Sequence, residues 1–158
     1  MITTIKVTAI IARGNNLLLI KEWSKKRRGY FWNVVKGTYD SKKDKDLISA
    51  ISREAREEVS LSLKVTGLAS VFILKRKNNM TVQFNFSCQA LSGKRSKLRK
   101  RYEKNEKIIA SAWFSKGELI KLGVKQLFNM RTKKIIDDFC TGTKATSLDF
   151  IRNFRELT

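Results

Sequence analysis

The chain has 158 residues, of which 42% are hydrophobic, and this is enough for one globular domain with a core. It contains no histidine, which excludes Ser-His and Cys-His catalysis and any His-ligated zinc site. Its 34 Lys and Arg residues against 14 Asp and Glu residues give a net charge of +20, which favours anionic partners. Two cysteines, Cys88 and Cys140, are too few for a disulfide framework, so we expect reduced thiols and a cytoplasmic protein.

The N-terminal segment is predicted to form a β-hairpin. Strands are expected over residues 4–12 and 17–23, and Gly14-Asn15-Asn16 supplies the turn between them. Lys6 and Arg13 interrupt the apolar residues, so the segment does not have the pattern of a secretory signal. No apolar run approaches the ~18 residues that a membrane span needs, and we therefore expect no membrane partner.

A run of four cations, residues 25–28, occupies the next predicted loop. It is either an ordinary solvated segment or a rim that attracts phosphate groups. On the second interpretation, Arg27 and Arg28 are candidate substrate-binding residues. Residues 31–37 follow as a predicted short buried strand, in which Lys36 points either at a substrate phosphate or at water.

The first predicted helix follows a polar, charged loop. Apolar residues recur at steps of three and four over residues 47–59, which predicts a helix that ends at about Ser60. Asp44 and Asp46 precede it, and either carboxylate is suited to accept hydrogen bonds from the free N–H groups of the first turn.

Three carboxylates are clustered on this helix. Glu54, Glu57 and Glu58 have i, i+3 and i+4 spacing, so they project from neighbouring positions. Like charges at this spacing destabilise a helix by roughly a few tenths of a kcal/mol per pair, which Arg53 and Arg56 partly relieve. The cluster is therefore either a solvated helix face or a site for a hard cation. Magnesium prefers carboxylate oxygens and keeps several waters, an arrangement suited to metal-assisted attack on a phosphoanhydride.

The run from Arg53 to Leu61, REAREEVSL, resembles the second half of the Nudix hydrolase box, G-x5-E-x7-R-E-U-x-E-E-x-G-U, where U is a bulky apolar residue. Ser60 stands where the family has Gly, and Ser is less tolerant of a left-handed conformation. The first half of the box differs more. Gly37 is separated from Arg53 by two residues more than in the family, and Asp44 or Asp46 is the nearest substitute for the first Glu.

The resemblance implies roles for the matching residues. Glu57 and Glu58 are expected to bind Mg²⁺, or Mn²⁺ in its place, with the carbonyl of Gly37 as a further ligand. Glu54 is expected to be a metal ligand or the general base, and Arg53 to hold a carboxylate of the box in position. The implied fold is a Nudix-like α/β/α sandwich of the α/β (α+β) class, with a mixed sheet flanked by helices.

The rest of the chain fits that layout. Residues 61–75 and 80–91 alternate like two paired strands, and the polar face of the second strand, which includes Gln83 and Asn85, either lines a ligand groove or meets solvent. A strand is expected over residues 106–114, followed by a short helix and by a second helix from Val124 onward. We therefore expect one domain over residues 1–158, with basic loops near 25–28 and 94–104.

Two functions are compatible with these features. The first is a magnesium-dependent hydrolase that cleaves a phosphoanhydride bond in a nucleoside diphosphate derivative or a related pyrophosphate. The alternative is a catalytically weak or inactive module of the same fold that binds RNA or another polyanion through its basic loops, and RNA decapping is an intermediate case that uses both features. The sequence predicts neither the substrate nor the oligomeric state.

Overall fold

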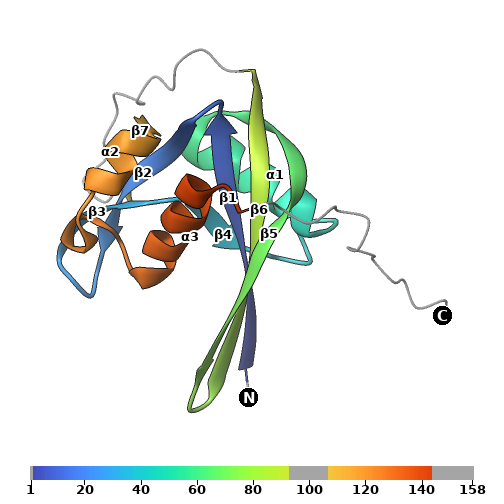
Figure 1. Ribbon diagram of the computed structural model, residues 1–158. Helices are drawn as coiled ribbons and strands as arrows, with labels where there is room; N and C mark the ends of the chain where they lie inside the picture. Colours follow the sequence, from blue (N-terminus) through green and yellow to red (C-terminus); the bar gives the residue numbers. More distant parts are fainter. Residues whose placement is uncertain (1, 93–106, 144–158) are drawn as a thin grey trace.

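The computed structural model describes residues 2–92 and 107–143. The strands are β1 (Ile2–Arg13), β2 (Asn16–Ser24), β3 (Gly29–Asn33), β4 (Val35–Thr38), β5 (Ser62–Arg76), β6 (Asn79–Ser92) and β7 (Ile108–Ser115). The helices are α1 (Leu47–Val59), α2 (Lys116–Lys121), the 3-10 turn η1 (Val124–Gln126) and α3 (Met130–Thr141). Helix α1 covers one face of the sheet, and α2 and α3 cover the other (Figure 1), which confirms the predicted sandwich of helices around a mixed sheet.

Strand β1 is the centre of the sheet. The strand order of the sheet is β3-β2-β1-β6-β5, and in addition β4 pairs with β1 and β7 pairs with β2. Strands β1 and β6 are parallel, whereas β1 runs antiparallel to both β2 and β4. The predicted N-terminal hairpin is confirmed, and its turn contains Gly14 at a φ of +56°, a conformation that glycine adopts without steric cost.

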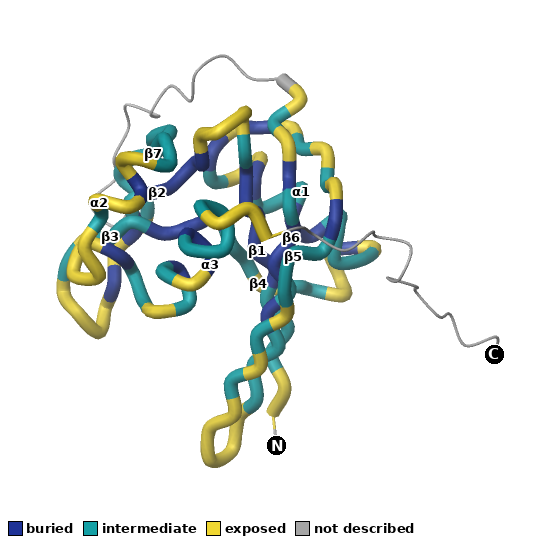
Figure 2. Tube along the Cα trace, viewed as in Figure 1, coloured by how far each residue is buried: buried dark blue, intermediate teal, exposed yellow. Residues whose placement is uncertain are grey.

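The sheet is apolar on both faces because helices cover both. In β2, Leu18 and Ile20 belong to the core beneath α1, whereas Leu17 and Leu19 belong to the core beneath α2 and α3. All four side chains are fully buried, as expected for a strand between two helical layers. Figure 2 shows this buried centre and the exposed tip of the β5–β6 hairpin, which extends beyond the helices.

Helix α1 has well-defined ends. Asp46 caps its start, because its carboxylate accepts from the N–H of Ser49 at 2.7 Å while the Ser49 hydroxyl accepts from the N–H of Asp46 at 2.9 Å. Asp44, the other predicted cap, makes different contacts. Ser60 ends the helix in the left-handed conformation, with a φ of 56°, as the family glycine would do more easily.

Two predicted boundaries were wrong. The strand expected over residues 31–37 is two strands, since β3 pairs with β2 whereas β4 pairs with β1, and the chain changes partner at the buried Val34. The helix expected from Val124 onward begins only at Met130, after the turn η1, and is capped by the side chain of Asn129. The basic loop expected near residues 94–104 lies outside the described residues. Among the helices described, none combines the length and apolar character required to cross a membrane.

Replacing Ser60 by Gly is expected to stabilise the protein. A non-glycine residue at a φ of 56° carries a steric cost that glycine avoids, so we expect Ser60→Gly to raise the free energy of unfolding by about 0.5–1 kcal/mol. This corresponds to a rise in melting temperature of roughly 1–4 °C. The matched control is Ser52→Gly inside α1, which is expected to lower the melting temperature instead. A fall in both variants would contradict the assignment of strain to Ser60.

Candidate functional site

Gly37 and Glu54 lie in direct contact. Strand β4 runs beside α1, and a Cβ atom added at Gly37 would lie 1.9 Å from Cδ and 2.0 Å from Oε1 of Glu54. No side chain fits at position 37 unless Glu54 moves away. The fold thus brings together two residues that are far apart in the sequence. The glycine is required for the close approach of strand and helix.

Arg53 connects the loop, the strand and the helix of the site. Its Nε and Nη2 atoms donate to the two carboxylate oxygens of Asp44 at 2.8 and 3.0 Å. Its Nη1 atom contacts Oε1 of Glu54 at 2.9 Å and Oε2 of Glu57 at 3.1 Å, and Nη2 also donates to the carbonyl of Thr38 at 3.3 Å. The hydrogen bonds from Arg53 hold the pKa of Asp44 below its ordinary value, so this pair stays charged.

Glu58 and Glu54 line one cavity of about 560 Å³ beside β4. Burial raises the pKa of Glu58 to about 8, and the negative charges of Glu54 and Glu22 add to this effect. Its Oε2 atom accepts a hydrogen bond from the backbone N–H of Lys36 at 3.4 Å. Desolvated carboxylates that repel one another are stabilised by a shared cation, because the cation favours their ionised forms.

Glu57 lies on the outer side of this pair. Its side chain is 58% exposed, and it does not line the cavity that contains Glu54 and Glu58. Within residues 2–92 and 107–143, no three acidic or cysteine side chains stand close enough to hold one ion. The donor set still fits a hard divalent cation in its chemistry, since it consists of carboxylates, and the contacts of Arg53 use one oxygen each of Glu54 and Glu57.

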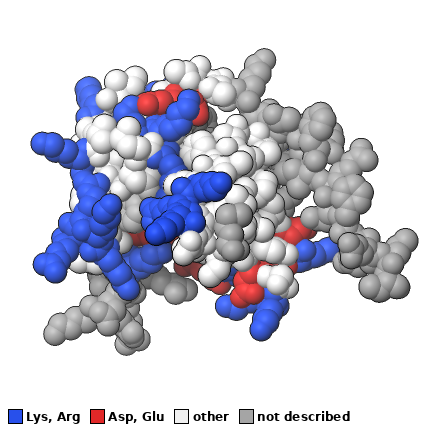
Figure 3. Space-filling model, turned by 90° about the horizontal axis from the view of Figure 1, so that it is seen from below, with Lys and Arg blue, Asp and Glu red and all other residues white. Residues whose placement is uncertain are grey.

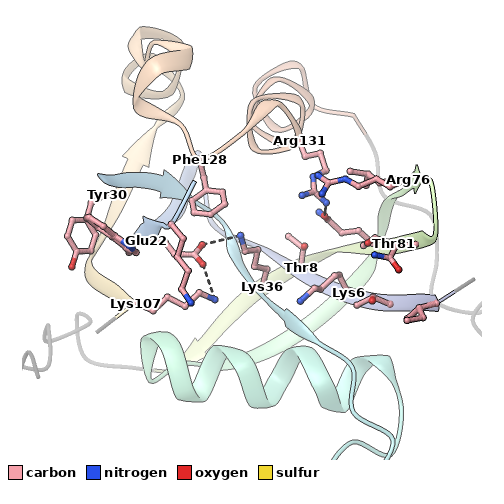
Figure 4. A pocket seen from close by; sticks show the side chains of 17 residues that line it. Lys6, Thr8, Glu22, Tyr30, Lys36, Arg76, Thr81, Lys107, Phe128 and Arg131 are labelled. Carbon is pink, nitrogen blue, oxygen red and sulfur yellow. Dashed lines mark hydrogen bonds and ion pairs between the residues drawn. The ribbon is translucent and has the colours of Figure 1, made fainter. Parts of the chain in front are cut away.

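Glu22 was not among the residues predicted from the sequence, and it forms ion pairs with two of the lysines of the site. This carboxylate is 1% exposed, and its oxygens lie 3.1 Å from Nζ of Lys36 and 3.0 Å from Nζ of Lys107 (Figure 4). It also accepts a hydrogen bond from Nδ2 of Asn33 at 2.7 Å. Burial alone would raise the pKa of Glu22, but Lys36, Lys107 and Asn33 together keep that pKa below its ordinary value. The available signal was an acidic residue at the end of an apolar strand.

A larger cavity of about 1190 Å³ adjoins the first. Lys6, Lys36 and Lys107 line both cavities, so the two spaces meet at these cations. Thr81 and Gln83 from β6 also line the larger cavity. Of the two alternatives for the polar face of that strand, a ligand groove or contact with solvent, this favours the ligand groove. Six cations line this cavity against the single carboxylate of Glu22: Lys6, Lys25, Lys36, Arg76, Lys107 and Arg131.

The run of cations at residues 25–28 is exposed, but its members differ in position. The guanidinium of Arg27 donates to the carbonyls of Leu127 at 2.5 Å and Lys125 at 2.7 Å, so it fastens the β2–β3 turn to the segment before α3. Neither Arg27 nor Arg28 lines the two cavities described above, whereas Lys25 lines the larger one. Of this run, Lys25 is the member that lines a described cavity, and the substrate contacts of Arg27 and Arg28 stay a prediction.

The raised pKa of Glu58 predicts how the stability of the protein changes with pH in the absence of divalent cations. This residue's folded pKa of about 8 lies above the ordinary 4.5, so its contribution to stability is present below pH 4.5 and is lost as the pH rises through 8. Glu58→Gln cannot ionise. With chelator present, we expect the melting temperature of the wild type to fall relative to Glu58→Gln, by roughly 2–4 °C or more, between about pH 5 and 9. For the control Asp137→Asn, the difference in melting temperature from the wild type should stay constant over this pH range. A constant difference for Glu58→Gln would contradict the raised pKa assigned to Glu58.

Comparisons with solved structures show the same fold. A NUDIX hydrolase from Nitrosomonas europaea is 22% identical, with a TM-score of 0.77 over 96% of this chain and 97% of the other. A UDP-X diphosphatase is 18% identical, with a TM-score of 0.62 over 92% and 66%. An ADP-ribose pyrophosphatase from Streptococcus suis is 20% identical, with a TM-score of 0.64 over 90% and 92%.

A comparison with curated proteins gave no match. The family comparison is decisive, because the NUDIX domain matches residues 3–139, which is most of the chain. The match includes the acidic helix α1, strand β4 with Gly37, and the strands that line both cavities. From the sequence match and the shared fold together, we conclude that this chain belongs to the Nudix family.

Proposed function

We propose that this protein is a magnesium-dependent hydrolase that cleaves the phosphoanhydride bond of a nucleoside diphosphate derivative. The observation that carries the proposal is the junction of the two cavities. A desolvated pair of carboxylates, Glu54 and Glu58, lies in one of them, and three lysines at the junction lead into a cavity rich in cations. An anionic pyrophosphate at this junction would meet both a cation site and lysine side chains. Similar folds named UDP-X diphosphatase and ADP-ribose pyrophosphatase support the substrate class.

Glu54 and Glu58 line one cavity, and with the exposed side chain of Glu57 turned toward them these three carboxylates and the carbonyl of Gly37 would hold Mg²⁺. Mn²⁺ has similar ligand preferences. When bound, such an ion lowers the pKa of a water molecule and neutralises charge on the phosphate oxygens. Arg53 keeps Glu54 and Glu57 oriented through the contacts of its Nη1 atom. The close approach of Gly37 to Glu54 brings β4 against the acidic helix α1.

Glu54 is our candidate for the general base, which orients the attacking water and accepts its proton. It lines the same cavity as Lys6, Lys36 and Lys107, whose ammonium groups are suited to bind phosphate oxygens. Glu22 positions Lys36 and Lys107 through its two carboxylate oxygens. These two lysines therefore share one buried counter-charge and retain hydrogen-bonding capacity for a substrate, since an ammonium group has three donors.

We also propose a cytoplasmic location and a single domain over residues 1–158. Cys88 is buried and Cys140 is partly buried, and both are free thiols, which supports a reducing compartment. The two hydrophobic cores lie on opposite faces of one sheet, and this supports a single cooperative unit.

Removal of one carboxylate charge is expected to abolish metal-dependent turnover. Glu57→Gln and Glu58→Gln each remove a proposed ligand, so we expect kcat with magnesium to fall by ~10²-fold or more while folding is retained. The measurement is phosphate release from a panel of nucleotide sugars, ADP-ribose, nucleoside di- and triphosphates, dinucleoside polyphosphates and thiamine pyrophosphate, with magnesium or with chelator. Asp137→Asn on α3 is the control and should retain activity. Near wild-type turnover in Glu57→Gln would remove that residue from the site, and turnover that persists in chelator would overturn the metal requirement.

RNA binding is the second candidate, and the exposed cations at residues 25–28 favour it. On the face shown in Figure 3, Lys and Arg side chains form larger groups than Asp and Glu. If the protein makes six to ten phosphate contacts, its affinity for RNA falls by roughly 10³–10⁵-fold between 50 and 200 mM salt. We expect hydrolysis of a small pyrophosphate to change much less over this range. Tight RNA binding with this salt dependence in a protein that hydrolyses no pyrophosphate would favour the binding module.

A further inference from the structure

One end of the larger cavity contains two arginines that have no carboxylate partner among the described residues. Arg76 ends β5 and Arg131 lies in the first turn of α3, and both line the cavity away from Glu22 (Figure 4). Nη1 of Arg131 donates to the amide oxygen of Gln83 at 2.8 Å, which is a neutral group. No Asp or Glu of residues 2–92 and 107–143 forms an ion pair with either arginine.

This end of the cavity therefore holds uncompensated positive charge. Burial lowers the pKa of Arg131, and the charge of Arg76 lowers it further, so the two guanidinium groups repel each other at close range. The opposite end is different, because Glu22 lies within 3.1 Å of Lys36 and within 3.0 Å of Lys107. Unpaired like charges that face a cavity reduce stability, and a bound anion would remove that cost.

Thr8 supplies an independent observation between the two ends. It is fully buried, and its Oγ1 atom is the one buried side-chain oxygen or nitrogen of the described residues that has no hydrogen-bond partner. The same side chain lines the larger cavity, and Figure 4 places it between Lys36 and Arg131. Buried hydroxyl groups are almost always hydrogen-bonded, so an unpartnered one that faces a cavity indicates a missing ligand atom or water.

We propose that Arg76, Arg131 and Thr8 bind a second phosphate group of the substrate, remote from the pyrophosphate that is cleaved. The preferred substrates are then nucleoside diphosphate derivatives that also carry a phosphate monoester. A phosphate monoester matches this end best, because its charge of nearly −2 balances two guanidinium groups and its oxygens accept several hydrogen bonds. Gln83 orients Arg131, and the hydroxyl of Thr8 donates to the bound group. This inference rests on the proposed function, since it assigns the cleaved bond to the junction at Lys36.

The test uses pairs of pyrophosphates that differ only in the remote phosphate. Suitable pairs are ADP-ribose 2′-phosphate and ADP-ribose, NADPH and NADH, and coenzyme A and dephospho-coenzyme A. We expect the wild type to have a kcat/KM at least ~10-fold higher for the phosphorylated member of at least one pair. Arg131→Gln and Arg76→Gln should each lower that value by ~10-fold or more and leave the unphosphorylated member within about twofold. Lys77→Gln, in the adjacent exposed turn outside the cavity, removes the same charge and should change neither.

Binding without turnover separates this inference from the proposed function. In chelator, calorimetry should show tighter binding of the phosphorylated member, and Arg131→Gln should remove the difference whereas Arg131→Lys should restore part of it. If no pyrophosphate is hydrolysed but this binding preference persists, the proposed function fails while the second phosphate site stands. Equal kcat/KM and equal binding for both members of every pair in the wild type, or an equal loss for both members in Arg131→Gln, would overturn the inference.

Discussion

The acidic site depends on the hydrogen bonds and ion pairs that the guanidinium group of Arg53 makes. This group reaches Asp44 in the loop, the carbonyl of Thr38 at the end of β4, and the carboxylates of Glu54 and Glu57 on α1. These groups come from three successive segments of the chain, and a planar fork of donors holds them in one geometry. The same arginine separates the carboxylates that would otherwise repel one another on a single helix face.

The cations around that site fall into two groups, those with a bonded partner that balances or holds them and those without an acidic partner among the described residues. Near α1, Lys36 and Lys107 have their charges balanced by the buried Glu22. Arg27, outside both cavities, is bonded to backbone carbonyls of the segment before α3. At the far end of the larger cavity, the arginines have no acidic partner among the described residues. The cations that give the net charge of +20 are thus not spread evenly over the surface. Some of them line a cavity that adjoins the carboxylates.

Much of the fold follows from local patterns in the sequence. The steps of three and four over residues 47–59 predicted α1, and the alternation around Gln83 and Asn85 predicted β6. The break at Val34 was missed because the chain there changes its partner strand, which no local pattern records. The carboxylates of α1 were found because they are neighbours on one helix. Glu22 and Arg131 were not, since only the pairing of distant strands and the placement of α3 bring them to the same cavity.

The β5–β6 hairpin also has a mechanical consequence. Its outer part extends beyond the helices and pairs with strand β1, and Ile73 there is 68% exposed. Yet this part contributes Leu74, Arg76 and Asn79 to the wall of the larger cavity. One wall of the cavity is therefore a ribbon whose outer residues belong to neither core, so a change in its bend would move Arg76 relative to Arg131 while both cores stay packed. The residues proposed to bind the remote phosphate therefore lie on β1, β5 and α3, and none of them lies on α1, the helix that carries the acidic groups.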